Sequence, residues 1–291
     1  MRNETPSWQC RFLSKDHFEQ LYHTFIAAFS DYVLPFDLTF EQFCNHIKLN
    51  AVDINRTVGC FEGDTMVAFS LNGFGTWNGK QTVYDAGTGV ITAKRRQGIS
   101  EEMFNMMMPL FEEDGIEQFL LEVITTNKAA INLYEKFGFT KVRELALLKC
   151  NHLIESDILQ PADLEIREIA EPDWELFQTF WDGEPSWQNM PRAAMRVIET
   201  RGIIGAFMNG SCIGYIVFSR NLGRVSQLAV AKDYRNQGVA TSLIRRTQAE
   251  IESGATIQII NIDKSLEDAM KFFKNRGFHE FVSQYEMVKA M

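Results

Sequence analysis

The feature that most constrains the fold of this chain is an internal repeat. Arg95–Ser100 reads Arg-Arg-Gln-Gly-Ile-Ser, and Arg235–Ala240, 140 residues later, reads Arg-Asn-Gln-Gly-Val-Ala. Tyr134–Phe139 aligns in the same way with Phe273–Phe278, at an offset of 139 residues. Shared landmarks in the same order and at similar spacing predict a duplicated domain, which determines how many folding units the chain forms.

The repeat also predicts the domain boundaries. The two copies open alike, with Arg11-Phe-Leu in the first and Arg167-Glu-Ile in the second. A chain of 291 residues is long enough for two domains of ordinary size. We therefore expect an N-terminal domain over residues 1–150, a linker over 151–163 and a C-terminal domain over 164–291.

Both copies show the same order of apolar runs, helical patterns and turns. In the first copy we expect strands at Cys10–Leu13, Val58–Phe61, Met66–Phe74, Thr82–Ile91, Gln118–Ile124 and Val142–Lys149, with helices at Asp16–Phe29, Thr39–Asn50, Ile99–Glu113 and Lys128–Phe137. In the second we expect strands at Leu164–Glu168, Gly202–Met208, Cys212–Arg220, Arg224–Val230, Thr256–Asn261 and Glu280–Val288, with helices at Pro172–Phe180, Arg192–Thr200, Gly238–Ser253 and Leu266–Asn275. A meander followed by a β-α-β unit predicts an α/β or α+β class with a mixed sheet.

Composition and charge argue against several kinds of protein. The net charge of −9 disfavours binding to nucleic acid or to an anionic membrane. No apolar run approaches the roughly 18 residues of a membrane span. The five cysteines are scattered and never spaced C-x-x-C, which indicates a reducing cytoplasm rather than a disulfide framework. The five histidines form no H-E-x-x-H pattern, so we expect no metal site.

A strand, a basic turn and a helix follow one another directly in Thr88–Ser100 and again in Leu228–Ala240. Free backbone N–H groups at a helix N-terminus form an anion site that suits a diphosphate. Gly98 permits a close approach of the backbone, and Arg95 can add a charge-assisted contact. A glycine-bearing turn of this kind is also typical of an ordinary tight connection, so both interpretations stay open on these residues alone.

A second motif narrows the choice. Asn127-x-x-Ala-x-x-Leu-Tyr134-x-x-x-Gly-Phe follows Gly98 by about thirty residues, and the combination resembles the GNAT superfamily of N-acetyltransferases. The resemblance covers roughly residues 10–149 and 164–291, and it implies two tandem GNAT-type domains, each a mixed, mostly antiparallel sheet flanked by helices. It also implies acetyl-CoA as cosubstrate, without a metal. The cofactor-binding residues it implies are Thr88, Gly89, Val90, Arg95, Arg96, Gln97, Gly98, Ile99, Ser100 and Asn127, and Leu228, Ala229, Val230, Arg235, Asn236, Gln237, Gly238, Val239 and Ala240.

The resemblance implies a direct attack of an amine on the acetyl thioester. The backbone N–H of Val90 would polarise the thioester carbonyl, and Tyr134 would protonate the leaving thiolate. A base must also remove a proton from the amine. Glu122 and Asp85, on the two strands that flank the expected cleft, are the best-placed carboxylates.

The second copy departs from the family pattern. Phe273 stands at the position of Tyr134, and Leu266 at the position of Asn127. Because phenylalanine has no proton to give, this site binds CoA without catalysis, uses water as the acid, or shapes the acceptor site. We therefore predict an acetyl-CoA-dependent N-acetyltransferase whose N-terminal domain is active. The alternatives are a non-catalytic acyl-CoA-binding protein and catalysis in the C-terminal domain only.

The acceptor and the assembly are less constrained. We expect a small-molecule or peptide amine, with Asp31–Pro35 and Trp181–Trp187 as candidate acceptor-binding loops. Two copies joined by a short linker are expected to pair within one chain, which predicts a monomer. A homodimer is the alternative.

Overall fold

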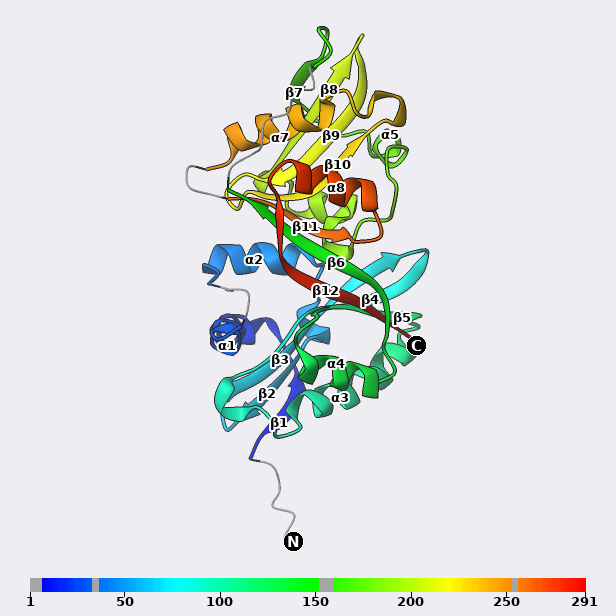
Figure 1. Ribbon diagram of the computed structural model, residues 1–291. Helices are drawn as coiled ribbons and strands as arrows, with labels where there is room; N and C mark the ends of the chain where they lie inside the picture. The colour runs from blue at the N-terminus through cyan, green and yellow to red at the C-terminus, as the bar shows by residue number, and fades with distance from the viewer. Residues whose placement is uncertain (1–6, 33–36, 152–159, 253–255) are drawn as a thin grey trace. The chain divides into compact units, whose positions relative to one another are not determined.

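The computed structural model describes residues 7–32, 37–151, 160–252 and 256–291 (Figure 1). Most of the predicted linker, and residues 33–35 of the first candidate acceptor loop, lie outside these ranges. The described chain forms two compact units. Unit 1 holds the described residues of Met1–Val123, Asn127–Lys141 and Glu286–Met291, and unit 2 holds those of Ile124–Thr126 and Val142–Tyr285.

Unit 1 is a mixed sheet with helices on both faces (Figure 1). Its strands are β1 (Gln9–Phe12), β2 (Val58–Glu62), β3 (Thr65–Trp77), β4 (Lys80–Val90), β5 (Gln118–Ile124) and the end of β12 (His279–Ala290), in that spatial order. Its helices are α1 (Phe18–Phe29), α2 (Phe40–Leu49), α3 (Ile99–Glu113) and α4 (Lys128–Lys136). The strands from β1 to β4 pair antiparallel, and β4 pairs parallel with β5.

Alternate residues of β3 anchor the helices on the two faces of this sheet. Phe69 stacks on Phe25 of α1, with ring centroids 5.5 Å apart. Phe74, which points to the other face, meets Phe111 of α3 edge to face at 5.6 Å. The period-two pattern of one strand therefore builds a core on each side of the sheet.

Local capping explains where helix α2 begins. Thr39 accepts a hydrogen bond from the backbone N–H of Gln42 at 3.2 Å, and the Gln42 side chain accepts one from the Thr39 N–H at 3.0 Å. This reciprocal capping box satisfies two amides that a helix end otherwise leaves unpaired. Helix α3 begins instead after Gly98, whose φ of 79° is left-handed and suits glycine.

Unit 2 has the same architecture. Its strands are β7 (Glu165–Glu168), β8 (Arg201–Met208), β9 (Ser211–Ser219), β10 (Arg224–Val230), β11 (Ile257–Asp263), β6 (Thr140–Cys150) and the start of β12, in that spatial order. Its helices are α5 (Trp174–Gln178), α6 (Pro191–Arg196), α7 (Val239–Glu250) and α8 (Glu267–Asn275). Strands β7 to β10 form an antiparallel meander, and β10 pairs parallel with β11.

Strand β9 contributes side chains to the core on each face of the unit 2 sheet, as β3 does in unit 1. Tyr215 stacks face to face on Phe177 of α5, with ring centroids 3.8 Å apart. Ile216 points to the opposite face and belongs to the core that includes Leu243 of α7 and Phe273 of α8. Both cores thus use one central strand of the meander.

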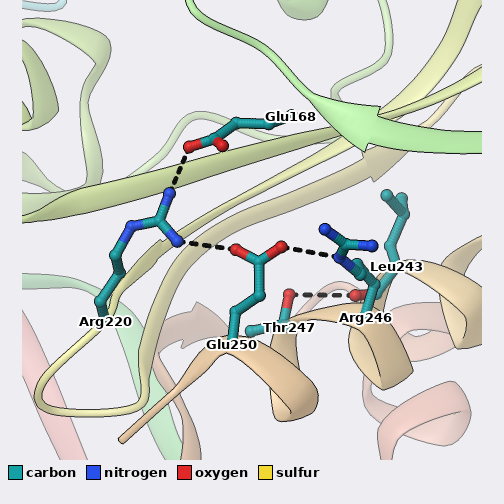
Figure 2. Close-up of polar contacts among 6 residues, drawn as sticks. All are labelled: Glu168, Arg220, Leu243, Arg246, Thr247 and Glu250. Carbon is teal, nitrogen blue, oxygen red and sulfur yellow. Dashed lines mark hydrogen bonds and ion pairs between the residues drawn. The ribbon is translucent and has the colours of Figure 1, made fainter.

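A chain of ion pairs fastens the edge of unit 2 (Figure 2). Arg220, just after β9, binds Glu168 of β7 and, at 2.7 Å, Glu250 of α7. Glu250 also binds Arg246 one helical turn away at 2.7 Å. Because Arg220 and Arg246 are partly exposed, each pair stabilises the fold by about 1 kcal/mol or less. Their joint effect is to connect the edge strand β7, the turn between β9 and β10, and helix α7.

The last strand of each repeat contributes to the other repeat's unit, because residues 142–150 of β6 lie in unit 2 and residues 286–290 of β12 lie in unit 1. Strand β6 ends the first repeat, yet Ala146, Leu148 and Cys150 lie in the buried core of unit 2. Strand β6 pairs antiparallel with β11, with Cys150 opposite Ile257. In unit 1 the backbone N–H of Met291, at the end of the second repeat, donates to the Glu117 carbonyl at 3.0 Å. The compact units therefore do not coincide with the two sequence repeats.

Cys10 and Cys60 form a disulfide within unit 1. They are direct partners in the antiparallel ladder of β1 and β2, with Cα atoms 3.9 Å apart. The spacing of the cysteines along the chain did not predict this bond, because strand pairing alone brings the two residues together. Cys44, Cys150 and Cys212 take no part in a disulfide.

The shared strand leads to a prediction about stability. Met287, in the part of β12 that belongs to unit 1, is fully buried. We expect Met287→Ala to lower the free energy of unfolding by about 2–5 kcal/mol, because it leaves a cavity. Hydrogen exchange should then accelerate at the amides of β5. Met195→Ala is the matched control, since that side chain is 44% exposed. Equal stability of the two variants would show that β12 contributes little to unit 1.

Candidate active site

The parallel ladder between β4 and β5 ends well before the strands do. Its register runs from Thr82 opposite Gln118 to Tyr84 opposite Leu120. Strand β4 continues to Val90 without further pairing to β5 in that register. Asp85 is thus the first residue of β4 beyond the ladder, at the point where a group can enter between the two strands.

Beyond this point, β4 leads into the basic loop. The chain makes one short turn at Thr92–Lys94 and then places Arg96 at φ 62° and Gly98 at φ 79°. The loop of unit 2 repeats this conformation, with Asn236 at φ 59° and Gly238 at φ 81°. Alternating left-handed residues turn successive backbone N–H groups toward one side, which forms an anion-binding concavity next to the helix N-terminus. The conformation of both loops therefore fits a diphosphate.

One arginine in each loop holds the backbone geometry that the two loops share. Arg95 donates from Nε to the Val90 carbonyl at 3.1 Å and from its terminal nitrogens to Asp31, at 2.7 and 2.6 Å. It also donates to the Ala28 carbonyl at 2.9 Å, and the hydrogen bonds from Arg95 lower the pKa of Asp31. The guanidinium therefore clamps the loop to the end of α1. Its predicted contact with a diphosphate stays a prediction.

Arg235 makes the same clamp in unit 2. It donates to the Val230 carbonyl at 3.0 Å, to the Phe180 carbonyl at 3.0 Å and to Asp182 at 3.1 Å. The acidic partner again follows the first helix of the unit. An arginine that fixes the loop through both strand and helix explains why the two loops share their backbone conformation.

A buried polar cluster lies where the β4–β5 ladder ends. The hydroxyl of Tyr134, from α4, donates to Asp85 Oδ2 at 3.4 Å. Thr88 Oγ1 donates to the same oxygen at 2.9 Å, and the Gly87 N–H donates to Oδ1 at 2.9 Å. Asp85 is 7% exposed and Tyr134 is 8% exposed. Elements distant in sequence thus bring a carboxylate and a phenol into one site.

Burial sets the ionisation of this cluster. Loss of hydration raises the pKa of Asp85 to about 6, although hydrogen bonds from Thr88, Gly87 and Tyr134 oppose the shift. Burial also raises the pKa of Tyr134 well above its ordinary value, and the neighbouring charge of Asp85 adds to this rise. Near neutral pH the cluster therefore holds an ionised carboxylate beside a protonated phenol.

Asn127 and Tyr32 complete the cluster. Asn127 caps α4, because its Oδ1 accepts from the Ala130 N–H at 3.2 Å. Burial raises the pKa of Tyr32, and a hydrogen bond with the Asn127 side chain acts in the opposite direction. Tyr32 was predicted only as part of a candidate acceptor loop. Nothing in its local sequence indicated that the chain returns it to Asp85 and Tyr134.

The remaining predicted residues of unit 1 lie on the end of β4, on the loop that follows it, at the start of α3 and on β5. Thr88, Gly89 and Val90 form the end of β4, and the residues from Arg95 to Gly98 are exposed on the loop. Ile99 and Ser100 begin α3. Of the two candidate bases, Glu122 lies half-buried on β5. Asp85 is the one for which a hydrogen bond with Tyr134 is seen.

Unit 2 carries a cavity at the corresponding place. The ladder between β10 and β11 has two register pairs, Arg224 with Gln258 and Val225 with Ile259. A cavity of about 600 Å³ is lined by both strands and by the loop, including the predicted residues Leu228, Ala229, Val230, Arg235, Asn236, Gly238, Val239 and Ala240. Gln237 lies exposed on the same loop. The opening between these strands is large enough for an extended group.

Side chains at the inner end of this cavity differ from those of unit 1. Phe273, at the position of Tyr134, is buried against Phe278. Leu266, at the position of Asn127, is the N-cap of α8 and makes no capping hydrogen bond with its side chain. Tyr215 lines the cavity, but its hydroxyl donates to Gln227 and accepts from Trp181, both at 2.6 Å. The position that corresponds to Tyr134 is thus occupied by the apolar Phe273, and the Tyr215 hydroxyl is bound to uncharged side chains.

Across residues 7–32, 37–151, 160–252 and 256–291, no group of three or more His, Cys, Asp or Glu side chains is arranged to hold a metal ion. Within the same described ranges, no helix has the length and apolar character needed to cross a membrane.

The raised pKa of Asp85 predicts a pH-dependent stability. A carboxyl whose folded pKa exceeds its unfolded value binds its proton more tightly in the folded state. Its contribution to stability is therefore present below about pH 4 and is lost as the pH rises through about 6. We expect Asp85→Asn to be more stable relative to wild type at pH 8 than at pH 4, by on the order of 2–3 kcal/mol. Urea unfolding at both pH values measures this, and an identical difference at the two would contradict it.

Comparison with known families matches both halves of the chain. Residues 15–139 match a family described as "Acetyltransferase (GNAT) family". Residues 178–289 match one described as "Acetyltransferase (GNAT) domain". No curated protein matches the sequence significantly.

Solved structures show the same arrangement over the whole chain. A GCN5-related N-acetyltransferase from Sphaerobacter thermophilus is 13% identical, with a TM-score of 0.74 over 98% of this chain and 96% of that one. A tandem GNAT protein from the clavulanic acid biosynthesis pathway is 12% identical, with a TM-score of 0.73 over 97% and 98% of the two chains. At these identities the likeness establishes a shared fold.

Proposed function

The chain belongs to the GNAT superfamily of acetyltransferases as a tandem protein, and on that premise we propose that it transfers an acetyl group from acetyl-CoA to a primary amine. Unit 1 is the proposed catalytic unit. One observation carries this choice: the Tyr134 hydroxyl meets the Asp85 carboxylate where the β4–β5 ladder ends. Unit 2 has a phenylalanine at the position of the tyrosine.

The proposed reaction uses backbone and side-chain groups that lie around the end of the β4–β5 ladder. The loop at the N-terminus of α3 binds the diphosphate, and the pantetheine arm enters between β4 and β5. The amine attacks the thioester carbonyl, whose oxygen receives a hydrogen bond from the Val90 N–H. Asp85 takes the proton of the amine, and Tyr134 gives a proton to the departing thiolate. A carboxyl with a pKa of about 6 suits this task, because it is ionised near neutral pH and still accepts a proton.

Loss of the phenol hydroxyl tests the catalytic unit. Tyr134→Phe keeps the ring that packs against Phe104 and Phe139. We expect kcat to fall by about 10²–10⁴-fold while CoA affinity is retained, because only the proton donor is lost. Release of free thiol from acetyl-CoA, measured with a panel of amines, gives the rate. Tyr22→Phe is the control, since the Tyr22 hydroxyl donates to the Leu38 carbonyl outside the cluster. A full rate in Tyr134→Phe, with chemistry limiting, would contradict catalysis through this residue.

A second candidate function is acyl-CoA binding by unit 2, either alone or with its own transfer reaction. The cavity of about 600 Å³ between β10 and β11 favours it. The loop of unit 2 has the same left-handed positions as that of unit 1, which suits a diphosphate equally. The apolar Phe273 favours binding over proton transfer at this site.

Replacing the loop glycine of each unit with glutamate distinguishes CoA binding by unit 1 from CoA binding by unit 2. We expect Gly98→Glu to abolish binding of CoA to unit 1 and Gly238→Glu to abolish binding to unit 2, because the new carboxylate repels the diphosphate. Gly98→Ala and Gly238→Ala are the matched controls for the strain of a side chain at positive φ. Isothermal titration with CoA gives the stoichiometry of each variant. Unchanged affinity and stoichiometry in both glutamate variants would rule out diphosphate binding by these loops.

A further inference from the structure

The direction of one hydrogen bond raises a question about the proposed mechanism. The Tyr134 hydroxyl donates its proton to Asp85 Oδ2, so in this state the proton lies toward the carboxylate. To protonate a thiolate, the hydroxyl must give that proton up, and the resulting phenolate would lie beside an ionised carboxylate. Burial and the charge of Asp85 both oppose such a phenolate. A protonated Asp85 would remove this conflict.

We propose that Asp85 and Tyr134 form a proton relay, in which the proton that leaves the amine reaches the thiolate through both side chains. This inference rests on the proposed function of unit 1. It gives Asp85 two linked tasks, as base toward the amine and as proton donor toward Tyr134. The relay thereby joins the acid and the base of the reaction in one buried pair.

The protons and bonds of the relay balance. The amine nitrogen forms a bond to the acetyl carbon, and the carbon–sulfur bond breaks. The amine proton passes to Asp85 Oδ2, and the Tyr134 hydroxyl proton passes to the thiolate sulfur. The proton on Asp85 then moves to the Tyr134 oxygen, which restores the phenol and the carboxylate. One proton has moved from nitrogen to sulfur, and the two side chains end as they began.

The contacts around Asp85 limit the routes that a proton can take. Thr88 Oγ1 donates to the same oxygen as Tyr134, while the Gly87 N–H occupies Oδ1. Ser70 in turn binds Thr88 at 2.9 Å, so Thr88 is held as a donor to the carboxylate. Oδ2 is therefore the oxygen that Tyr134 and Thr88 share, and the Tyr134 phenol is the more acidic of the two hydroxyl donors.

Titratable groups on the neighbouring elements also face this pair. Tyr32, after α1, lies close enough for the charge of Asp85 to raise its pKa. His46 of α2 donates from Nε2 to the Ala86 carbonyl at 2.8 Å, next to Asp85 in the chain. Glu122 lies on β5, two residues beyond the last pair of the ladder. Asp85 and Tyr134 share a direct hydrogen bond, which makes them the pair through which a proton can pass.

A double-mutant cycle tests the relay. The variants are Asp85→Asn, Tyr134→Phe and the double variant, with Asp53→Asn as control because its carboxylate caps a turn outside the cluster. In a relay, each single substitution interrupts the same path. We expect each to lower kcat by about 10²–10⁴-fold and the double variant to be no slower than the slower single variant. Multiplied losses in the double variant would overturn the relay and leave an independent acid and base.

Two further measurements follow the reaction rate as the pH and the deuterium content of the solvent are varied. The wild type and Tyr134→Phe should both lose activity below about pH 6, whereas Asp85→Asn should lack that acidic limb. In mixtures of H₂O and D₂O, with chemistry limiting, the wild-type rate should curve with deuterium content because more than one proton moves. A linear dependence would overturn the relay without requiring any variant to fold. Absence of acetyl transfer from the wild type to every amine would instead contradict the proposed function.

Discussion

The early end of the parallel ladder between β4 and β5 is the constraint on which the rest of the site depends. Backbone groups beyond Tyr84 and Leu120 are no longer paired to each other, so the gap between the strands offers hydrogen-bonding groups to a ligand. The same departure leaves room for a side chain from α4 to reach β4. Tyr134 meets Asp85, which is the first residue of β4 beyond the ladder.

In unit 2 the backbone arrangement of the site recurs without the polar side chains of unit 1. The short β10–β11 ladder, the loop conformation and the arginine clamp all recur. The polar cluster does not, since Phe273 and Leu266 stand where Tyr134 and Asn127 stand in unit 1. In the proposed function, CoA binding would rely mainly on the backbone geometry that both units share, whereas proton transfer would rely on single side chains that differ between the units.

Local pattern predicted most of the elements, but it did not predict their partners, and the helix expected over Arg192–Thr200 ends at Arg196. Helix Ile99–Glu113 and strands Gln118–Ile124 and Arg224–Val230 lie where periodicity and turn residues indicated. The place of β6 in unit 2 was not predicted, because a last strand of similar pattern ends each repeat and its period fits either sheet. The role of Arg95 as a clamp escaped prediction for a related reason, since Asp31 lies 64 residues away along the chain.

The energetics of Asp85 argue that the polar cluster exists for chemistry rather than for stability. Its hydrogen-bonding partners in the described part of the chain, Thr88, Tyr134 and the Gly87 amide, are all uncharged. A buried carboxylate without a cationic partner destabilises the folded state near neutral pH, which its pKa of about 6 expresses. Asparagine would fill the same space without carrying that charge. An ionisable group kept at the end of the β4–β5 ladder despite this destabilisation fits the proposed role of Asp85 as a group that accepts a proton and passes it on.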